Sequence, residues 1–419
     1  MSAVRILLAL LSLMQISGTS PSAASAAPDE LKVYVVTFGP GDAPWEKFGH
    51  NMLVIEGSAG GIAYNWGMFD FAQKNFVWHF IQGKLWYWME GMDYQRVLDA
   101  YLADDRTVWV QELNLAPAQK QLLWDYARRN ELPENRFYKY DYFVDNCSTR
   151  VRDAVDAALG QQLRQKATTM PSDLTLRSET NRLTSGEWWL YTALDFILGE
   201  PTDEKMSAWD EMFIPMRMRA RINEITVRDP SSGREVPLVK SERVLNVSKR
   251  GALPERPPMR WPWFLGVGIV IAAVVMFGSA AAIRGNRLGK WSFLMAGFAW
   301  LLLSAFASWF LIYAWTLTDH VWVRRNENLL QLSPLALPMM VVLVLLLWKR
   351  TERMGKWALI LGVAMAGLSV LGLLLKVLPG VDQVNWNIIA LALPANAGMA
   401  WAVWKFGRAL PQTRKGVAE

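Results

Sequence analysis

Apolar residues are spaced in two different ways along this chain. From about residue 31 to 255, short stretches alternate between apolar and polar positions and are separated by turn residues. After about residue 260, apolar residues form five nearly continuous runs. A period of two predicts half-buried strands, whereas apolar runs of roughly 20 residues predict membrane-spanning helices. The sequence therefore predicts an α+β domain at 27–255 and an α-helical membrane domain at 256–419.

The first region contains several alternating, β-branched stretches that predict strands. Their residue ranges are 31–40, 49–57, 62–67, 84–91 and 106–115. The turn sequence "SAGG" joins the second and third of these, which predicts a β-hairpin. Helical spacing appears at 93–105 and 116–130, and from 147 onward in "DNCSTRVRDAVDAAL". Residues 160–255 are expected to be helical and then to form a hairpin.

Basic residues sort the loops between the apolar runs into two kinds. The predicted spans are 261–283, 291–315, 330–348, 357–377 and 388–404. Three clusters of basic residues alternate with two loops that lack such a cluster. The first cluster is Arg284, Arg287 and Lys290, and the second is Lys349, Arg350, Arg353 and Lys356. The third, which follows the last span, is Lys405, Arg408, Arg414 and Lys415. By the positive-inside rule these clusters face the cytoplasm, which places residues 27–255 on the other side. The net charge of +6 therefore reflects membrane topology and does not indicate nucleic-acid binding.

The N-terminus carries an export signal. Arg5 precedes the short apolar stretch "ILLALLSLM", and "ASA" at 24–26 is a small-residue cleavage site. We expect a signal peptide at 1–26, and for a bacterial chain this predicts a multi-pass inner-membrane protein whose first domain is periplasmic. Cysteines in that compartment usually pair, yet Cys147 is the only cysteine in the chain. It is therefore either an inert buried residue or a reactive thiol.

The position of Cys147 favours reactivity. Asp145 or Asn146 is a suitable N-cap, so Cys147 falls in the first turn of the helix that follows. Exposed amides and the helix dipole lower the pKa of a cysteine placed there. A thiolate needs a base, and the chain has three histidines: His50, His79 and His320. We predict that His50, at the start of the 49–57 strand, is the base, and that His79 packs or faces solvent.

A third group should orient the imidazole. The returning strand "IAYNWG" would place a side chain beside His50 across the hairpin. Asn65 is the first candidate, with Tyr64 and Asp70 as alternatives. Arg150 either attracts a phosphate or stabilises the contact between helix and sheet. We find no metal-ligand spacing, no glycine-rich phosphate loop and no serine-hydrolase elbow, and we expect neither a metal nor another cofactor.

The stretches "WEKFGHNMLVI", "YNWGMFDF" and "NRFYKYDYFVDNCSTRVRDAV" resemble the periplasmic domain of the Lnb family, the lipoprotein N-acylation transferase system B. The resemblance covers about residues 30–160. The order of His and Cys also resembles the permuted papain-like thiol enzymes that include lecithin:retinol acyltransferase. The resemblance implies a permuted papain-like domain in which Cys147 is the nucleophile and His50 the base. It also implies an acyl transfer from a phospholipid donor to the N-terminal cysteine of a lipoprotein acceptor.

Two other functions remain open at this stage. The same residues would serve a membrane-anchored cysteine peptidase or amidase of the cell envelope, with water as acceptor. Alternatively, the domain binds a lipid or peptide without catalysis. The loop at 316–334 contains His320, Asn326 and Asn328 just outside the membrane, and we predict that with Arg150 they bind substrate. The alternative for this loop is a charged connection tolerated on the outer side.

Overall fold

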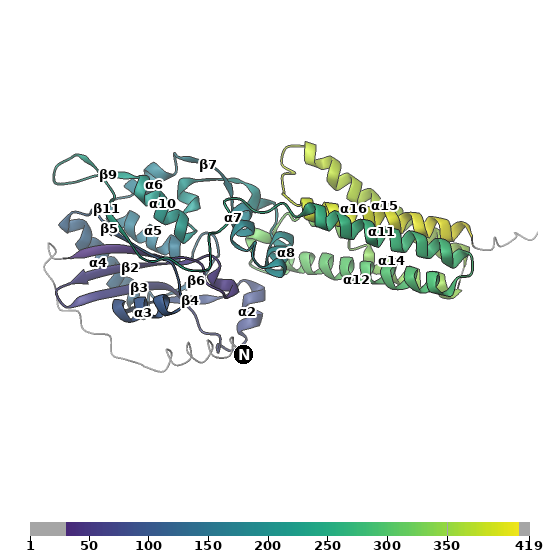
Figure 1. The fold of residues 1–419 in the computed structure, drawn as a ribbon, viewed down its shortest axis with the longest axis horizontal. Coiled ribbons are helices and arrows are strands. Elements are labelled where there is room, and N and C mark those ends of the chain that lie inside the picture. Colours follow the sequence, from purple (N-terminus) through teal and green to yellow (C-terminus); the bar gives the residue numbers. More distant parts are fainter. Residues whose placement is uncertain (1–30, 350, 410–419) are drawn as a thin grey trace, which may run out of the picture. The chain divides into compact units, whose positions relative to one another are not determined.

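The computed structural model describes residues 31–349 and 351–409, so the signal peptide predicted at 1–26 lies outside the described residues. The chain forms two compact units (Figure 1). The first comprises the described residues up to Phe71, Trp86–Pro171 and Ser207–Gly251. The second comprises Ala72–Leu85, Ser172–Met206 and the chain from Ala252 onward.

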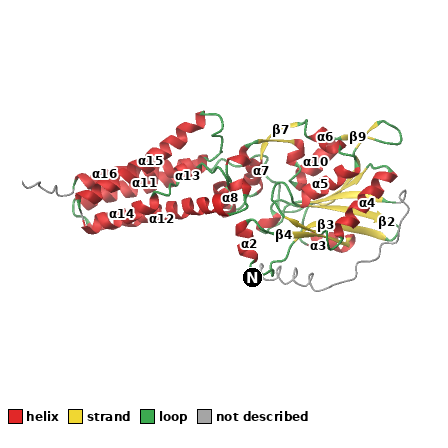
Figure 2. Cartoon of the chain, turned by 180° about the vertical axis from the view of Figure 1, so that it is seen from behind, coloured by secondary structure: helices red, strands yellow, loops and turns green. Residues whose placement is uncertain are grey.

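The first unit is built on a seven-stranded antiparallel sheet in the order β11-β5-β1-β2-β3-β4-β6 (Figure 2). The strands are β1 (Lys32–Phe38), β2 (His50–Gly57), β3 (Gly60–Met68), β4 (Trp86–Asp93), β5 (Val108–Leu113), β6 (Phe137–Lys139) and β11 (Val239–Asn246). All five predicted strands are present, and β2 and β3 form the predicted hairpin. Helices cover both faces of the sheet, so β1 and β2 are buried along most of their length and not only at alternate positions.

The helices of this unit bury the two faces of the sheet separately. They are α3 (Tyr94–Ala103), α4 (Pro117–Glu131), α5 (Cys147–Ala158), α6 (Gln162–Ala167), α9 (Ala208–Glu211) and α10 (Pro215–Glu224). Val35 and Leu53 belong to the core that includes α4, α5 and α10, whereas Val36 and Met52 face the core that includes α3. A small hairpin, β9 (Thr226–Arg228) and β10 (Glu235–Pro237), follows α10, as the sequence predicts. Helix α5 thereby packs directly on β2 and β3.

The second unit contains five helices long and apolar enough to cross a membrane. Their ranges are Trp261–Ile283, Arg287–Leu317, Asn328–Leu346, Glu352–Val377 and Trp386–Arg408. They correspond to α11 (Trp261–Ile283), α12 (Arg287–Leu317), α13 (Asn328–Gln331) with α14 (Ala336–Lys349), α15 (Glu352–Leu374) with η5 (Leu375–Val377), and α16 (Trp386–Arg408). The number of spans is confirmed. Several helices extend past the apolar runs, because polar caps such as Asn286 start them earlier than hydropathy indicates.

A buried asparagine connects four of these helical segments. The Asn396 side chain accepts a hydrogen bond from Trp300 Nε1 at 2.9 Å, and its amide nitrogen donates to Gln331 O and Ser369 Oγ at 2.9 and 2.8 Å. Asn396 is 1% exposed. Polar groups inside a bilayer find no water, so such bonds hold helices together. The amide therefore joins α12, α13, α15 and α16.

The boundary between the units does not fall at residue 255 alone. Two segments that precede it, Ala72–Leu85 and Ser172–Met206, belong to the unit of the membrane helices. They contain α2 (Phe76–Gln82), α7 (Leu176–Leu183), α8 (Trp188–Ile197), η3 (Glu200–Asp203) and most of the pair β7 (Pro171–Thr175) and β8 (Lys205–Ser207). The cause is hydrogen bonding to loops between spans: Asn328 Nδ2 donates to Phe196 O at 2.9 Å, for example. Local sequence patterns do not reveal hydrogen bonds between residues that are far apart in the chain.

The segment 172–206 is held together by a buried arginine. The Arg177 guanidinium donates to both oxygens of Asp203 at 2.9 Å and to the carbonyl oxygens of Asp195 and Leu198 at 2.6 and 2.7 Å. Arg177 is 1% exposed. Burial raises the pKa of Asp203 to about 6, although the charge and hydrogen bonds of Arg177 act in the opposite direction. Arg177 therefore helps to keep the buried carboxyl group of Asp203 ionised.

We expect Arg177→Ala to destabilise the protein by about 3–5 kcal/mol, since it leaves a buried carboxylate and two buried carbonyls without their partner. The midpoint of thermal unfolding in detergent micelles measures this. Lys205→Ala is the matched control from the same segment, because Lys205 pairs with Asp173 in an ion pair whose two side chains are largely exposed. Equal midpoints for the two variants would contradict the role given to Arg177.

Candidate active site

Helix α5 begins at Cys147, and its first turn is firmly capped. The Asn146 side chain accepts hydrogen bonds from the backbone N–H of Ser148 at 2.8 Å and of Thr149 at 3.0 Å. Its amide nitrogen donates to Phe213 O at 3.0 Å, which ties the cap to the chain that follows α9. The predicted N-cap is therefore Asn146 rather than Asp145. Cys147 occupies the first helical position and is partly exposed.

His50 is oriented by its neighbours on β2 and β3. The preceding Gly49 has a φ of +79°, and a Cβ there would lie 2.6 Å from Phe38 O, so only glycine fits without strain. His50 Nε2 lies 2.8 Å from Asn65 Oδ1. The Asn65 amide nitrogen faces the sulfur of Met68 at 3.2 Å. Sulfur accepts and cannot donate, so the Asn65 oxygen faces His50 and Nε2 carries the proton.

The structure brings the side chains of His50 and Cys147 close enough for each to shift the pKa of the other. Since Nε2 is occupied by Asn65, Nδ1 is the ring nitrogen left for the sulfur. Burial by itself lowers the pKa of His50, but the charge and hydrogen bond of Cys147 outweigh it and the net pKa is raised. Burial raises the pKa of the Cys147 thiol, but His50 and two backbone N–H groups outweigh it and the net pKa is lowered. Both directions favour a thiolate beside an imidazolium.

The two backbone donors to the sulfur belong to Asn51 and Ser148. Their side chains are joined as well, because Asn51 Nδ2 donates to Ser148 Oγ at 2.9 Å. Thr37 Oγ1 donates to Asn51 Oδ1 at 2.8 Å, and Ser148 Oγ donates to Met212 O at 2.6 Å. Thr37, Asn51 and Ser148 are all 0% exposed. This chain of bonds fixes strand β2 against helix α5 and holds both N–H groups at the sulfur.

Gly67 leaves room for the pair. Its φ is +110°, and β3 has a register shift between Trp66 and Met68. A Cβ at Gly67 would lie 3.5 Å from Cys147 Cβ and 3.5 Å from His50 Cε1. The glycine therefore lies directly against both side chains, and any larger residue would fill the space beside them.

Three tyrosines, Tyr87, Tyr138 and Tyr140, lie near enough to Cys147 to be affected by its charge. Tyr87 stacks on Phe69 and lies against Tyr140, with ring centroids 5.0 and 4.1 Å apart. Burial raises the pKa of Tyr87 to about 12, and the charge of Cys147 adds to the shift. The same two causes raise the pKa of Tyr138 and Tyr140. The phenols therefore stay neutral and form a largely apolar wall.

Sequence reasoning named Asn65, Tyr64 and Asp70 as partners for His50, and Asn65 makes the contact. Tyr64 is 1% exposed and points into the core on the opposite face of β3. Asp70 lies beyond the end of β3 at Met68. Asn51 and Gly67 were missed. The sequence did contain a sign of each: Asn51 is a polar residue within an otherwise apolar strand, and Gly67 is a glycine within a predicted strand.

Arg150 is engaged within the first unit. Its guanidinium forms two hydrogen bonds with the carboxylate of Asp145 and lies 4.2 Å from the centre of the Tyr138 ring. These contacts correspond to the structural alternative, in which Arg150 stabilises the start of α5. His79 is half-buried on α2.

The loop residues predicted to bind substrate have internal partners in the second unit. His320 Nε2 donates to Phe80 O at 2.9 Å. Asn326 is 2% exposed and Asn328 0%, and their amide nitrogens donate to backbone carbonyls of residues 196–198. The two asparagines therefore bind the end of α8. Asn326 also lines a cavity of about 320 Å³ together with Trp315 and Arg325, and its role in substrate binding stays a prediction.

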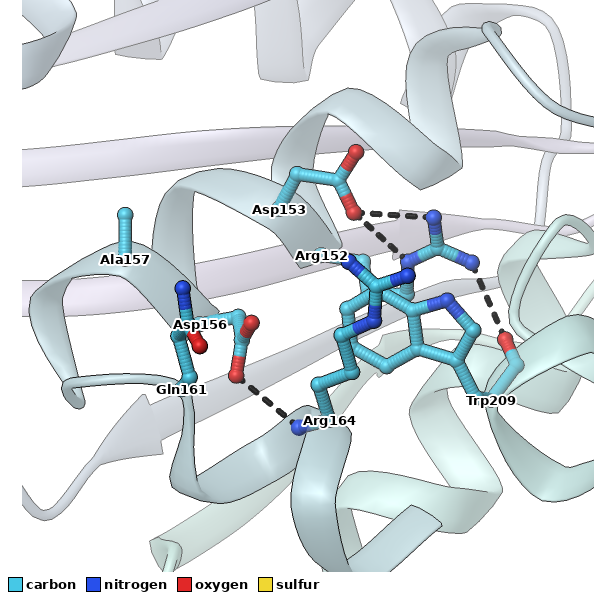
Figure 3. Close-up of a pocket in the computed structure, with 7 residues that line it drawn as sticks. All are labelled: Arg152, Asp153, Asp156, Ala157, Gln161, Arg164 and Trp209. Atoms are coloured by element: carbon cyan, nitrogen blue, oxygen red, sulfur yellow. Dashed lines mark hydrogen bonds and ion pairs between the residues drawn. The ribbon is translucent and has the colours of Figure 1, made fainter. Parts of the chain in front are cut away.

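A separate cavity of about 400 Å³ lies in the first unit and does not include Cys147 or His50 (Figure 3). The Arg152 guanidinium lies 3.8 Å from the centre of the Trp209 ring, pairs with Asp153 and donates to Trp209 O at 3.0 Å. The backbone N–H of Arg164 donates to Asp156. These groups largely satisfy one another. Among residues 31–349 and 351–409, no group of three His, Cys, Asp or Glu side chains is placed to hold a metal ion.

Comparison with known families identifies the domain that carries this site. Residues 20–180 match the family model of the Lnb N-terminal periplasmic domain. The first part of the chain is thus an Lnb-type N-terminal periplasmic domain. None of the curated proteins and none of the solved structures matches the chain. The match and the five apolar helices together indicate a multi-pass membrane protein with a periplasmic N-terminal domain.

We expect iodoacetamide to alkylate Cys147 readily at pH 7, below the pKa of about 8.5 of an ordinary thiol. In His50→Ala the imidazolium is lost while burial remains, so the thiol pKa rises and the rate at pH 7 falls at least about tenfold, one pKa unit being tenfold in thiolate. The single cysteine makes the product unambiguous by mass spectrometry.

His79→Ala is the control for this measurement and should keep the wild-type rate. In the wild type, the rate should decline only as the pH falls through the lowered pKa of the thiol. A rate in His50→Ala equal to that in His79→Ala would show that His50 does not ionise the sulfur.

Gly49→Ala should lower the thermal midpoint and the alkylation rate together, because both the positive φ and the contact with Phe38 O oppose a side chain directly before His50. Gly60→Ala is the control that separates the cost of the positive φ from the cost of the steric contact. Gly60 has a φ of +114°, but no atom lies within 4 Å of a Cβ placed there. We expect Gly49→Ala to be less stable than Gly60→Ala by about 1–3 kcal/mol, the usual cost of overpacking. A smaller loss than in Gly60→Ala would contradict this.

Proposed function

We propose that this protein is a thiol acyltransferase. In this proposal Cys147 takes an acyl chain from a phospholipid as a thioester and passes it to an amine, the α-amine of the N-terminal cysteine of a lipoprotein. The observation that carries the proposal is the polarised His50–Cys147 pair, held by Asn65 and two backbone amides, in a domain anchored by five membrane spans.

The first half-reaction forms the thioester. His50 Nδ1 takes the proton of the Cys147 thiol, and the sulfur attacks the carbonyl carbon of the phospholipid ester. The negative charge that develops on the carbonyl oxygen is stabilised by amides at the start of α5. The bond between this carbon and the alcohol oxygen then breaks. The lysophospholipid leaves with the proton that His50 held.

The second half-reaction forms the amide. The amine nitrogen attacks the thioester carbon, and the carbon–sulfur bond breaks. His50 takes the surplus proton from nitrogen and returns it to the sulfur, which restores the starting pair. The net change converts an ester and an amine into an amide and an alcohol, with no oxidant or cofactor. Asn65 holds the ring so that Nδ1 serves both steps.

Two further features support an amphiphilic substrate. The aromatic wall of Tyr87, Tyr138 and Tyr140 is neutral and suits the start of an acyl chain. Five spans are also more than a tether requires, and they keep the enzyme in the same bilayer as a phospholipid and a lipoprotein. We propose the inner membrane as this bilayer.

The test is expression of the chain in a bacterial strain that lacks its own lipoprotein N-acylation, followed by mass spectrometry of lipoprotein N-termini. We expect the wild type to add one N-linked acyl group, Cys147→Ala to add none, and His50→Ala to add at least about a hundredfold less, the usual contribution of a general base. Asn65→Ala should be intermediate.

Arg152→Ala serves as the control for chemistry, because Arg152 lines the separate cavity and not the His50–Cys147 pair. Wild-type expression with no acyl gain would overturn the proposal. Release of free fatty acid or cleaved peptide in the same strain would then indicate a hydrolase that uses water as acceptor.

A further inference from the structure

Helix α2 exposes large apolar side chains next to the membrane helices. Val77 is 68% exposed and Trp78 51%, and no residue of this helix is buried. The helix is nevertheless well defined, because left-handed residues, Asn75 and Gly83, bound it at both ends. Adjacent exposed apolar residues on a rigid helix are costly in water and indicate a binding surface.

The place where α2 is attached indicates what covers this surface. The N–H of Asp319 donates to Gln82 O, and His320 Nε2 donates to Phe80 O, both at 2.9 Å. Asp319 and His320 follow the end of α12 at Leu317 by two and three residues. Because the N-terminal domain is periplasmic, α11 crosses inward and α12 returns outward. Helix α2 is therefore fixed to the periplasmic end of a membrane span.

A second exposed aromatic pair is attached to another span end. Trp188 and Trp189, at the start of α8, are 52% and 61% exposed. The guanidinium of Arg260 lies 3.9 Å from the centre of the Trp188 ring, and Arg260 immediately precedes α11 at Trp261. Tryptophan is enriched where a bilayer meets water. Both groups of exposed apolar residues, Val77 with Trp78 and Trp188 with Trp189, are thus attached at the ends of membrane-spanning helices.

We propose that α2 and the Trp188–Trp189 pair lie in the headgroup region of the periplasmic leaflet, with Val77, Trp78 and Trp189 reaching the acyl boundary. Exposed Lys74 and Lys84 flank α2, and their ammonium groups would contact lipid phosphates. An interfacial helix of this kind inserts about 5–10 Å. The occupant is the lipid surface itself, and the inference does not depend on the acyltransferase proposal.

Nitroxide labels on single cysteines test this in the full-length chain in phospholipid nanodiscs. Since Cys147 is the only native cysteine, Cys147→Ala and Cys147→Ser provide two independent backgrounds, each checked by its thermal midpoint. Val77→Cys, Trp78→Cys and Trp189→Cys are the test sites. Leu122→Cys, 58% exposed on α4 of the sheet unit, is the aqueous control, and Phe277→Cys, 76% exposed on α11, is the control within the span.

We expect oxygen, relative to a water-soluble nickel chelate, to collide with the labels at 77, 78 and 189 several-fold more often than with the label at 122. The label at 277 should give a higher ratio still. Values equal to that of Leu122 would overturn the proposal for the segment concerned. Protection from both reagents, with spin–spin broadening that disappears on dilution with unlabelled chain, would also overturn it and indicate a second copy.

Discussion

The hydrogen bond between Asn51 and Ser148 is the constraint on which the site depends. It joins a strand and a helix that are about a hundred residues apart in the chain, and it is fully buried. Because Asn51 is fixed, the preceding residue, His50, is held at the start of β2. Because Ser148 is fixed, the preceding residue, Cys147, is held at the start of α5 with its sulfur close to the imidazole. The N–H groups of the same two residues reach the sulfur, so one buried polar contact helps to position His50, Cys147 and both donors.

The second unit depends on polar contacts of a different kind. The carbonyl groups at the end of α8 are capped by Asn326, Asn328 and Gln383, which come from loops between spans. Arg177 satisfies the carbonyls and carboxylates on the remaining side. Such groups cannot be buried without partners. The 172–206 segment therefore assembles with the membrane helices, even though its sequence is that of an ordinary water-soluble stretch.

Local patterns predicted the elements that local physics decides. Alternation located the strands around His50 and Asn65, the Asn-Cys step located the start of α5, and apolar runs located all five spans. The proximity of His50 to Cys147 was expected because a reactive thiol needs a base, and a catalytic role for the two residues stays a prediction. Asn51, Gly67 and the partners of Asn326 did not follow, since each role is created by residues far away in the chain. The burial of the loop asparagines did not follow from the sequence either, because their partners are the distant carbonyl groups of residues 196–198.

The amide donors at the sulfur are held by Asn51, Asn146 and Ser148, and none of these contacts requires the sulfur. An oxygen or a methyl group in its place would leave the two N–H groups where they are. A variant without the thiol would thus keep both N–H groups and the geometry of the site. That form is the one in which a stalled complex could be captured for crystallography or cryo-microscopy.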